Sequence, residues 1–178
     1  MALRDDNERN PSGRDYKKAF GQFSSNKTQR ITTLKPVEVL LDAQADAGGG
    51  VHTIDFNKGD IIIKQSGMYL IIAGPQLGKV RGATPRWIDL WLRVNNIDVP
   101  NSNIRAVIID PQEKTVGIMN SVLPLNRGDT LNIVMAAETI EEGMGLEAIA
   151  PDGEPTISEY YHHRRTTRLK SQCSPSCS

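Results

Sequence analysis

The chain has 178 residues, which fits one domain with tails, and its 21 basic and 21 acidic residues cancel to a formal charge of zero. This balance excludes a global attraction to nucleic acid or to an acidic membrane surface. The two cysteines, Cys173 and Cys177, are both near the C-terminus, so the body is expected to fold without disulfides. No secretory signal is visible, and no run approaches the ~18 apolar residues of a membrane span.

Residues 1–30 are rich in polar and charged side chains. Such a composition offers too little apolar surface to offset the entropy lost on ordering, so we expect a flexible N-terminal arm. Within it, Tyr16, Phe20 and Phe23 recur at the spacing of one helix face. That spacing leaves open a short helix that a partner's groove would order.

From Ile31 onward, short apolar runs rich in β-branched residues are separated by Gly, Pro, Asn and Asp, a pattern typical of strands and turns. The strands are expected at 31–41, 51–56, 61–64, 68–73, 87–94, 104–109, 116–125, 131–135 and 143–149, with a loop at 42–50. So many short strands with frequent turns predict an all-β antiparallel sandwich, a jelly roll, over residues 31–157.

Two of these strands carry the most information. The run 68–73 is apolar on both faces, which places it centrally in a sheet. The run 87–94 alternates, and one face is expected in the core while the other meets solvent or a partner. The core face would carry Ile88, Leu90, Leu92 and Val94, and the other face Trp87, Asp89, Trp91 and Arg93.

Two turns repeat one another, Asn57-Lys-Gly-Asp60 and Asn126-Arg-Gly-Asp129. In both, the Gly is expected to supply a positive φ while Asp or Asn bonds nearby backbone. The second turn contains the integrin-attachment tripeptide Arg-Gly-Asp. Because turn chemistry already accounts for its Gly and Asp, we interpret it as structural.

Metal-binding residue types occur in two places. Glu138, Glu141 and Glu142 lie near one predicted loop. Because calcium prefers clustered carboxylates, a calcium site remains an open hypothesis, although these residues match no known ligand pattern. His162, His163 and the two cysteines are zinc-ligand types, but their spacing differs from that of structural zinc sites. A basic C-terminal tail over 158–178 is the preferred interpretation.

Catalytic machinery is not evident. His52 is the single histidine of the predicted body, which also lacks cysteine and any Gly-x-Ser-x-Gly turn. Asp55, Asp60, Asp89 and Asp110 would have to converge by folding to form an acid–base pair. We therefore predict a protein that is not an enzyme, with a carbohydrate-active enzyme as a remote alternative.

Three segments together resemble the trimeric jelly rolls of the tumour necrosis factor and complement component one-q head superfamily, in its compact bacterial and viral form. They are Ile63-Lys-Gln-Ser-Gly-Met-Tyr-Leu-Ile-Ile-Ala73, Leu92-Arg-Val-Asn-Asn-Ile-Asp-Val-Pro-Asn-Ser102 and Leu123-Pro-Leu-Asn-Arg-Gly-Asp-Thr-Leu-Asn-Ile-Val134. The resemblance implies a ten-strand homotrimer that recognises a protein or glycan ligand with its outer loops. It also implies a place outside a cell or on a particle surface, and it brings no catalytic residues.

For the contact between copies, we expect Tyr69, Ile71 and Met135 at the seam, because a strand that is apolar on both faces needs two burying partners. The C-terminus departs from the family pattern, since a basic segment follows Pro155-Thr-Ile-Ser158 where a last apolar strand is usual. Either 156–161 supplies a short closing strand or the sheet lacks one. A shifted reading frame is one hypothesis for this change in composition.

The leading interpretation is a non-enzymatic homotrimeric module for recognition or surface display. A structural protein of a virion or cell surface is the alternative, in which the jelly roll binds only its own copies and its scaffold. Neither interpretation requires nucleic acid, a membrane span or a cofactor.

Overall fold

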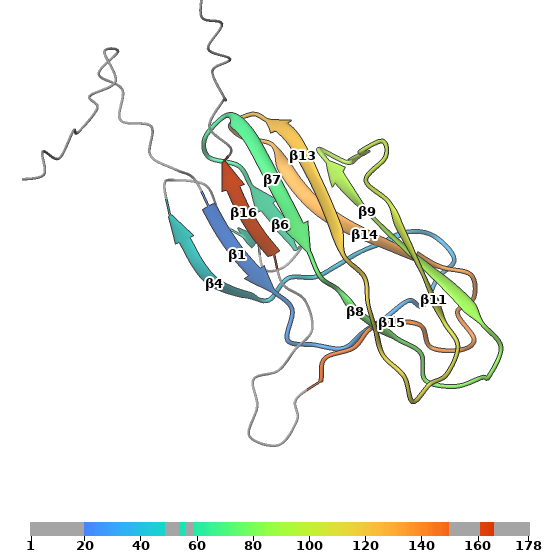
Figure 1. Cartoon of the computed structure of the whole chain (residues 1–178). Coiled ribbons are helices and arrows are strands. Elements are labelled where there is room, and N and C mark those ends of the chain that lie inside the picture. Colours follow the sequence, from blue (N-terminus) through green and yellow to red (C-terminus); the bar gives the residue numbers. More distant parts are fainter. Residues whose placement is uncertain (1–19, 49–53, 56–58, 150–160, 166–178) are drawn as a thin grey trace, which may run out of the picture.

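The protein folds as a β-sandwich in the computed structural model, which describes residues 20–48, 54–55, 59–149 and 161–165. Within these ranges the chain forms 16 strands and no helix. Every strand pair is antiparallel, and the strands build two facing layers with a short sheet at one end (Figure 1). The prediction of an all-β antiparallel sandwich is confirmed.

The first layer is built around β7, which pairs with β13 on one side and β16 on the other. Beyond β16 lies β1, which pairs with β4 (Figure 1). In spatial order the strands are β4 (Ala43–Gly48), β1 (Phe20–Ser24), β16 (Tyr161–Arg165), β7 (Gly67–Ala73) and β13 (Met119–Leu125). The predicted central position of 68–73 is therefore confirmed.

The second layer is built around the long pair β9 (Arg86–Val94) and β14 (Thr130–Ala137). On the outer side of β9 lie β10 (Ile97–Asp98) and β11 (Ile104–Ile108). On the outer side of β14 lie β3 (Val37–Glu38), β6 (Asp60–Ile62) and β5 (Ile54–Asp55), the last paired to β6.

A third sheet of very short strands lies at one end of the sandwich. Its order is β12 (Thr115–Val116), β8 (Gln76–Gly78), β15 (Gly145–Leu146) and β2 (Gln29–Arg30). In the sequence, β8 follows β7 and β15 follows β14, so this sheet joins the two layers. Gly145 is needed here, because a Cβ on it would stand 1.9 Å from the carbonyl oxygen of Gln29.

The core lies between the two layers and confirms the alternation expected for 87–94. Ile88, Leu90 and Leu92 are fully buried, whereas Trp87 and Trp91 are half-buried on the opposite face. Side chains from all parts of the chain fill the same interior. Its members include Phe23, Ile31, Leu41, Ile61, Ile63, Tyr69, Ile71, Leu77, Leu131, Ile133, Met135, Met144 and Leu146.

Turn chemistry also follows the sequence. Gly59 has a φ of 75° and Gly128 a φ of 95°, as expected for the two repeated turns. Asn95 and Asn96 both have positive φ, which gives the tight two-residue connection between β9 and β10. These turns set the register of the strands that they join.

The N-terminal boundary differs from the expectation. The predicted arm extends to residue 30, but β1 lies at Phe20–Ser24 and the side chain of Phe23 is fully buried. Phe20 and Phe23 therefore belong to a strand and not to a helix face, while Tyr16 lies outside the described residues. The predicted loop 42–50 is also wrong in part, since β4 pairs with β1 through backbone hydrogen bonds that require no apolar side chains.

Two further boundaries are corrected. The expected strand 31–41 is reduced to β3, because Pro36 lacks a backbone donor and the chain turns at 33–35. At the other end, β16 pairs with β7 inside the predicted tail, with Tyr161 opposite Ala73 and Arg165 opposite Tyr69. A closing strand thus occupies its place beside β7, a few residues later than 156–161.

Candidate recognition surfaces

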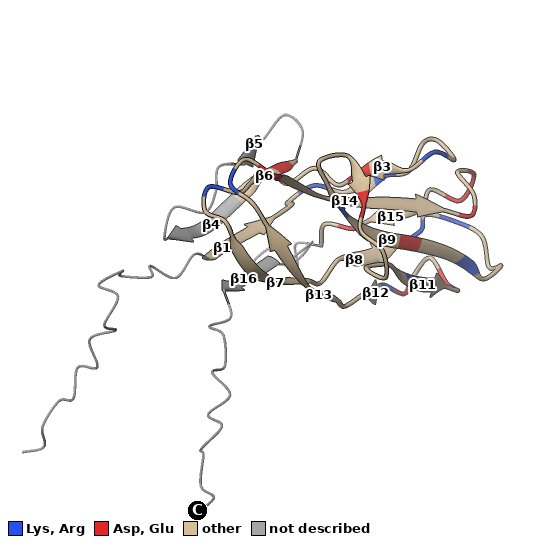
Figure 2. Ribbon diagram, turned by 90° about the horizontal axis from the view of Figure 1, so that it is seen from above, with Lys and Arg blue, Asp and Glu red and all other residues tan. Residues whose placement is uncertain are grey.

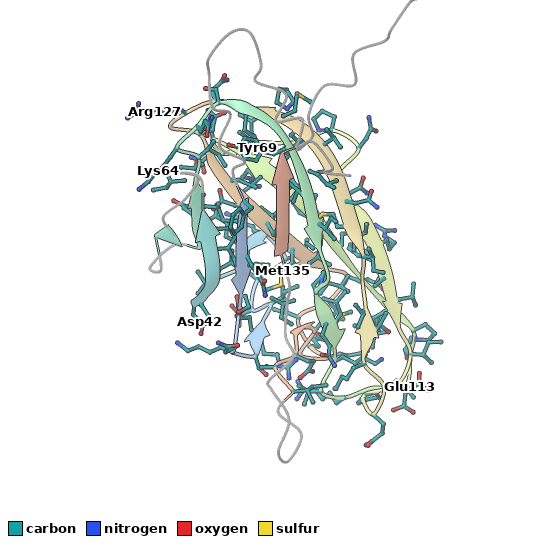
Figure 3. All side chains as sticks on the ribbon, turned by 60° about the vertical axis from the view of Figure 1, so that its left-hand side comes forward. Asp42, Lys64, Tyr69, Glu113, Arg127 and Met135 are labelled. Atoms are coloured by element: carbon teal, nitrogen blue, oxygen red, sulfur yellow. The ribbon has the colours of Figure 1, made fainter. Side chains whose placement is uncertain are left out.

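The residues predicted for the seam between copies point into the interior of one chain. Tyr69, Ile71 and Met135 are all fully buried. Tyr69 and Met135 are labelled in Figure 3. Tyr69 also donates its hydroxyl hydrogen to the carbonyl of Gln65. These side chains hold the two layers of a single chain together. Their assignment to a seam between copies stays a prediction, and this placement argues for other residues of the same strand.

The outward side of β7 and of its neighbour β13 is apolar and exposed. Met68 is 42 % and Ile72 37 % exposed on β7, with Leu70 half-buried between them. Val122, opposite Leu70 on β13, is 52 % exposed. We call Met68, Leu70, Ile72 and Val122 the β7–β13 face. Neither strand contains a charged residue, as the uniformly tan ribbons of β7 and β13 in Figure 2 show.

A second apolar surface lies where both layers end. Within the described ranges, β11 pairs only with β9, and β13 only with β7. The two sheet edges approach each other where Gly117 packs against Ile104, whose Cδ1 lies 2.6 Å from the position of a Cβ on Gly117. Val116 and Ile118, on either side of Gly117, are exposed apolar side chains, and Ile109 is exposed directly after β11. We call Ile109, Val116 and Ile118 the apolar edge.

The outward side of β9 has a different character. Arg105 lies over the ring of Trp87, with its guanidinium carbon 4.2 Å from the ring centroid, and forms two 2.7 Å hydrogen bonds to Asp89. Trp91 donates from Nε1 to an oxygen of Asp98 at 2.8 Å. That hydrogen bond, and the guanidinium of Arg93, lower the pKa of Asp98 and keep it ionised.

A network of ion pairs holds the loop between β8 and β9. Lys79 is fully buried, and its Nζ donates to the carbonyl of Thr84 at 2.7 Å and to Glu142 at 2.9 Å. Arg86 bonds the other oxygen of Glu142 at 2.9 Å and also reaches Glu138. The hydrogen bonds from Lys79 and Arg86 lower the pKa of Glu142. Lys79 thus acts as an internal anchor for the exposed loop 80–85.

These contacts bear on the calcium expectation. Two of the three carboxylates considered as calcium ligands, Glu138 and Glu142, already form ion pairs with Lys79 and Arg86. Calcium would have to displace these two cations. In the described part of the chain no group of three or more metal-ligand side chains comes together. His162 and His163 lie on β16, whereas Cys173 and Cys177 lie outside the described residues.

A second ion cluster joins the short end sheet. Glu147 packs against Gly78. It accepts two hydrogen bonds from Arg30, at 2.7 and 3.0 Å, and one from Lys114 at 3.3 Å. Burial raises the pKa of Glu147, but the bonds and positive charges of Arg30 and Lys114 outweigh it and the pKa is lowered. This cluster ties β2 to the chain after β15.

Three of the four aspartates considered for catalysis are engaged in other contacts. Asp89 binds Arg105, Asp60 accepts a hydrogen bond from Asn132, and Asp110 caps the backbone of Gln112. The register places Asp55 opposite Asp60, and His52 lies outside the described residues. Among the described side chains, the contacts of Asp60, Asp89 and Asp110 join each to an amide, a cation or the backbone and not to a second carboxylate.

The Arg-Gly-Asp turn is likewise committed to the fold. Asp129 accepts hydrogen bonds from the backbone of Asn126 and from the Asn95 amide, so both carboxylate oxygens are bound within the chain. Ser66 accepts the backbone N–H of Arg127 at 2.9 Å. The interpretation of this turn as structural fits these contacts.

Some of these surfaces were not evident in the sequence. The pairing of Arg105 with Asp89 depends on the register of β11 against β9, and the apolar edge depends on which strands end each sheet. The available signal was the outward set Trp87, Asp89, Trp91 and Arg93, whose mixed character already indicated a face in contact with solvent or a partner.

Comparisons with known proteins bear on the fold. No protein-family model and no curated protein matches the sequence. Among solved structures, a crystal structure of murine APRIL, of the tumour necrosis factor superfamily, superposes with a TM-score of 0.55 at 9 % identity. The match covers 84 % of this chain and 99 % of that one. Among the described residues no helix is long and apolar enough to cross a membrane. By its superposition on murine APRIL the chain has a jelly-roll fold.

Proposed function

We propose that the protein is a non-enzymatic recognition module that works as a homotrimer. The observation that carries the proposal is the presence of two separate exposed apolar surfaces on one chain, the β7–β13 face and the apolar edge. Contiguous apolar patches on a soluble chain mark interaction sites. The proposed seam therefore uses Ile72 and its outward neighbours in place of Tyr69, Ile71 and Met135.

Two different patches favour a head-to-tail contact, in which the edge of one copy packs on the face of the next. Such heterologous contacts make a ring when the rotation closes. A ring of three is favoured by the likeness to the tumour necrosis factor jelly roll. The absence of charge on β7 and β13 supports this, since a buried unpaired charge at the contact would be costly.

Ligand recognition would then use the exposed loops at the ends of the sandwich. The loop 80–85 is the best supported, because all six residues are exposed while the buried Lys79 and Glu142 hold its base. A protein or glycan ligand is consistent with such a loop. We infer a place outside a cell or on a particle surface from the same likeness, and the function requires no cofactor.

The test is the solution mass, measured by light scattering coupled to size exclusion. The unmodified chain is expected at three times the monomer mass, and Ile72→Glu at the monomer mass with its circular dichroism unchanged. Leu34→Glu is the matched control, because Leu34 is exposed but lies outside both apolar surfaces. A monomeric unmodified chain, or a trimeric Ile72→Glu protein, would contradict the proposal.

A further inference from the structure

Both tryptophans of the chain lie on the outward side of one strand. Trp87 and Trp91 are the only two in 178 residues, and both project from β9 away from the core. The largest fully buried side chains are instead Tyr69 and Phe23. Since tryptophan buries more apolar area than any other side chain, its place outside the core forgoes stability and indicates another use.

The two indoles are held in position by polar side chains. Arg105 covers Trp87 and is itself fixed by two hydrogen bonds to Asp89. Asp98 accepts one hydrogen bond from Nε1 of Trp91 and another from Nε of Arg93, each at 2.8 Å. Side chains that are oriented before a ligand arrives lose less entropy on binding. We call these six residues the Trp platform: Trp87, Asp89, Trp91, Arg93, Asp98 and Arg105.

The charges of the Trp platform decide between classes of ligand. Its two guanidinium groups are paired with Asp89 and Asp98, and Glu38 also lies 3.7 Å from Arg93. The platform therefore has no excess positive charge for a nucleic acid or another polyanion. The centre of a protein–protein contact is depleted of charged residues, whereas here Asp89 stands between the two indoles. The platform thus suits a ligand that is uncharged and rich in hydrogen-bonding groups.

We propose that the Trp platform binds a neutral oligosaccharide that lies along β9. The apolar C–H face of a sugar ring packs on the Trp91 indole, whereas the Trp87 ring is covered by Arg105 and supports that guanidinium. Sugar hydroxyls bond to the carboxylate and guanidinium groups. Asp98 and Arg105 are both more than half exposed and therefore accessible to such hydroxyls. This inference rests on the proposed function only in treating the chain as a recognition module, and it moves the ligand from the loops to a sheet face.

The spacing of the indoles sets the length of the ligand. Four residues of an extended strand span about 13 Å between the Cα atoms of Trp87 and Trp91. A ligand that lies along β9 and reaches both ends of the Trp platform is therefore longer than a single sugar ring. The site therefore takes a chain of several sugars, and a monosaccharide binds at least tenfold more weakly.

Intrinsic fluorescence tests the site directly, because both fluorophores belong to it. The unmodified protein is titrated with neutral hexasaccharides of glucose, mannose and N-acetylglucosamine, and at least one is expected to give a saturable change in emission. Calorimetry with that sugar then compares variants. Trp91→Ala is expected to weaken binding tenfold or more, as is usual for a central indole. Trp87→Ala, which removes the support under Arg105, and Asp98→Asn are each expected to weaken it severalfold.

Leu34→Ala is the matched control and is expected to bind like the unmodified protein. The inference is overturned if no neutral hexasaccharide changes the emission at millimolar concentration, if a sulfated polysaccharide binds more tightly, or if the folded tryptophan variants bind normally. Light scattering on the same samples separates the two proposals. A trimer without sugar binding contradicts this inference alone, and a sugar-binding monomer contradicts the trimer alone.

Discussion

β7 and β9 bury alternate side chains in the same core but present opposite characters to the outside. β7 has no charged residue (Figure 2) and exposes Met68 and Ile72. β9 instead turns two indoles outward, with Asp89 between them. Burial inside the chain does not distinguish the two strands. This difference underlies our two proposals, a contact with a further copy of the chain at β7 and a polar ligand at β9.

The largest expected effect on stability comes from the core, into which both β7 and β9 project side chains. Tyr69→Ala should destabilise the fold by about 3–5 kcal/mol and Leu90→Ala by about 2–5 kcal/mol, because each leaves a cavity in the core. Urea unfolding followed by circular dichroism measures both losses. Leu34→Ala, at an exposed position, is expected within about 0.5 kcal/mol of the unmodified protein. Wild-type stability in Tyr69→Ala would contradict its inward placement.

The next effect concerns the strand beside β7. A chain that ends at Ile157 lacks β16 and leaves the edge of β7 unpaired, at about 0.5–1.5 kcal/mol for each lost hydrogen bond. It is expected to unfold at lower urea and to aggregate, because open sheet edges pair with other chains. The matched control ends at Arg165 and keeps β16. Equal stability of the two shortened chains would show that β16 is dispensable.

Acid should destabilise the end of the sandwich that carries the ion pairs of Glu142 and Glu147. The lowered pKa values of Glu142 and Glu147 mean that their pairing stabilises the fold above the ordinary carboxyl pKa. That contribution is lost as the pH falls through the lowered folded-state values. Urea midpoints should therefore drop between about pH 5 and about pH 3. The drop is expected to be smaller in Glu147→Gln, and an equal drop would contradict the role of this carboxylate.

The smallest effect is expected on the outward side of β9. Arg105→Gln removes the cation over Trp87 and the bidentate bond to Asp89, yet the guanidinium is largely exposed and such pairs add little stability. The melting temperature should stay the same while the emission of Trp87 changes. A large fall in melting temperature would show that the Trp platform supports the fold instead of serving a ligand.

Local patterns accounted for the parts of the fold in which side chains decide the structure. The alternation in 87–94 predicted which face of β9 is buried, and the repeated Gly-Asp turns predicted the positive φ of Gly59 and Gly128. The reason is that period-two burial and left-handed backbone are each properties of a few consecutive residues.

The pairing of β4 and β16 through backbone hydrogen bonds could not be predicted from the sequence. β4 and β16 are polar segments whose partners, β1 and β7, are far away in the chain, and hydrogen bonds between backbones carry no side-chain signature. The predicted N-terminal arm is too long for the same reason. The burial of Phe23 depends on the place of β1 in the sheet.

The sequence by itself therefore determined the class of fold, its strand alternation and its turns. Tertiary structure alone decided which face of β7 is inward, and so moved the proposed seam from Tyr69 and Ile71 to Ile72. It also brought Arg105 over Trp87. The physical reason is that a strand apolar on both faces has no preferred side until the rest of the sheet covers one of them.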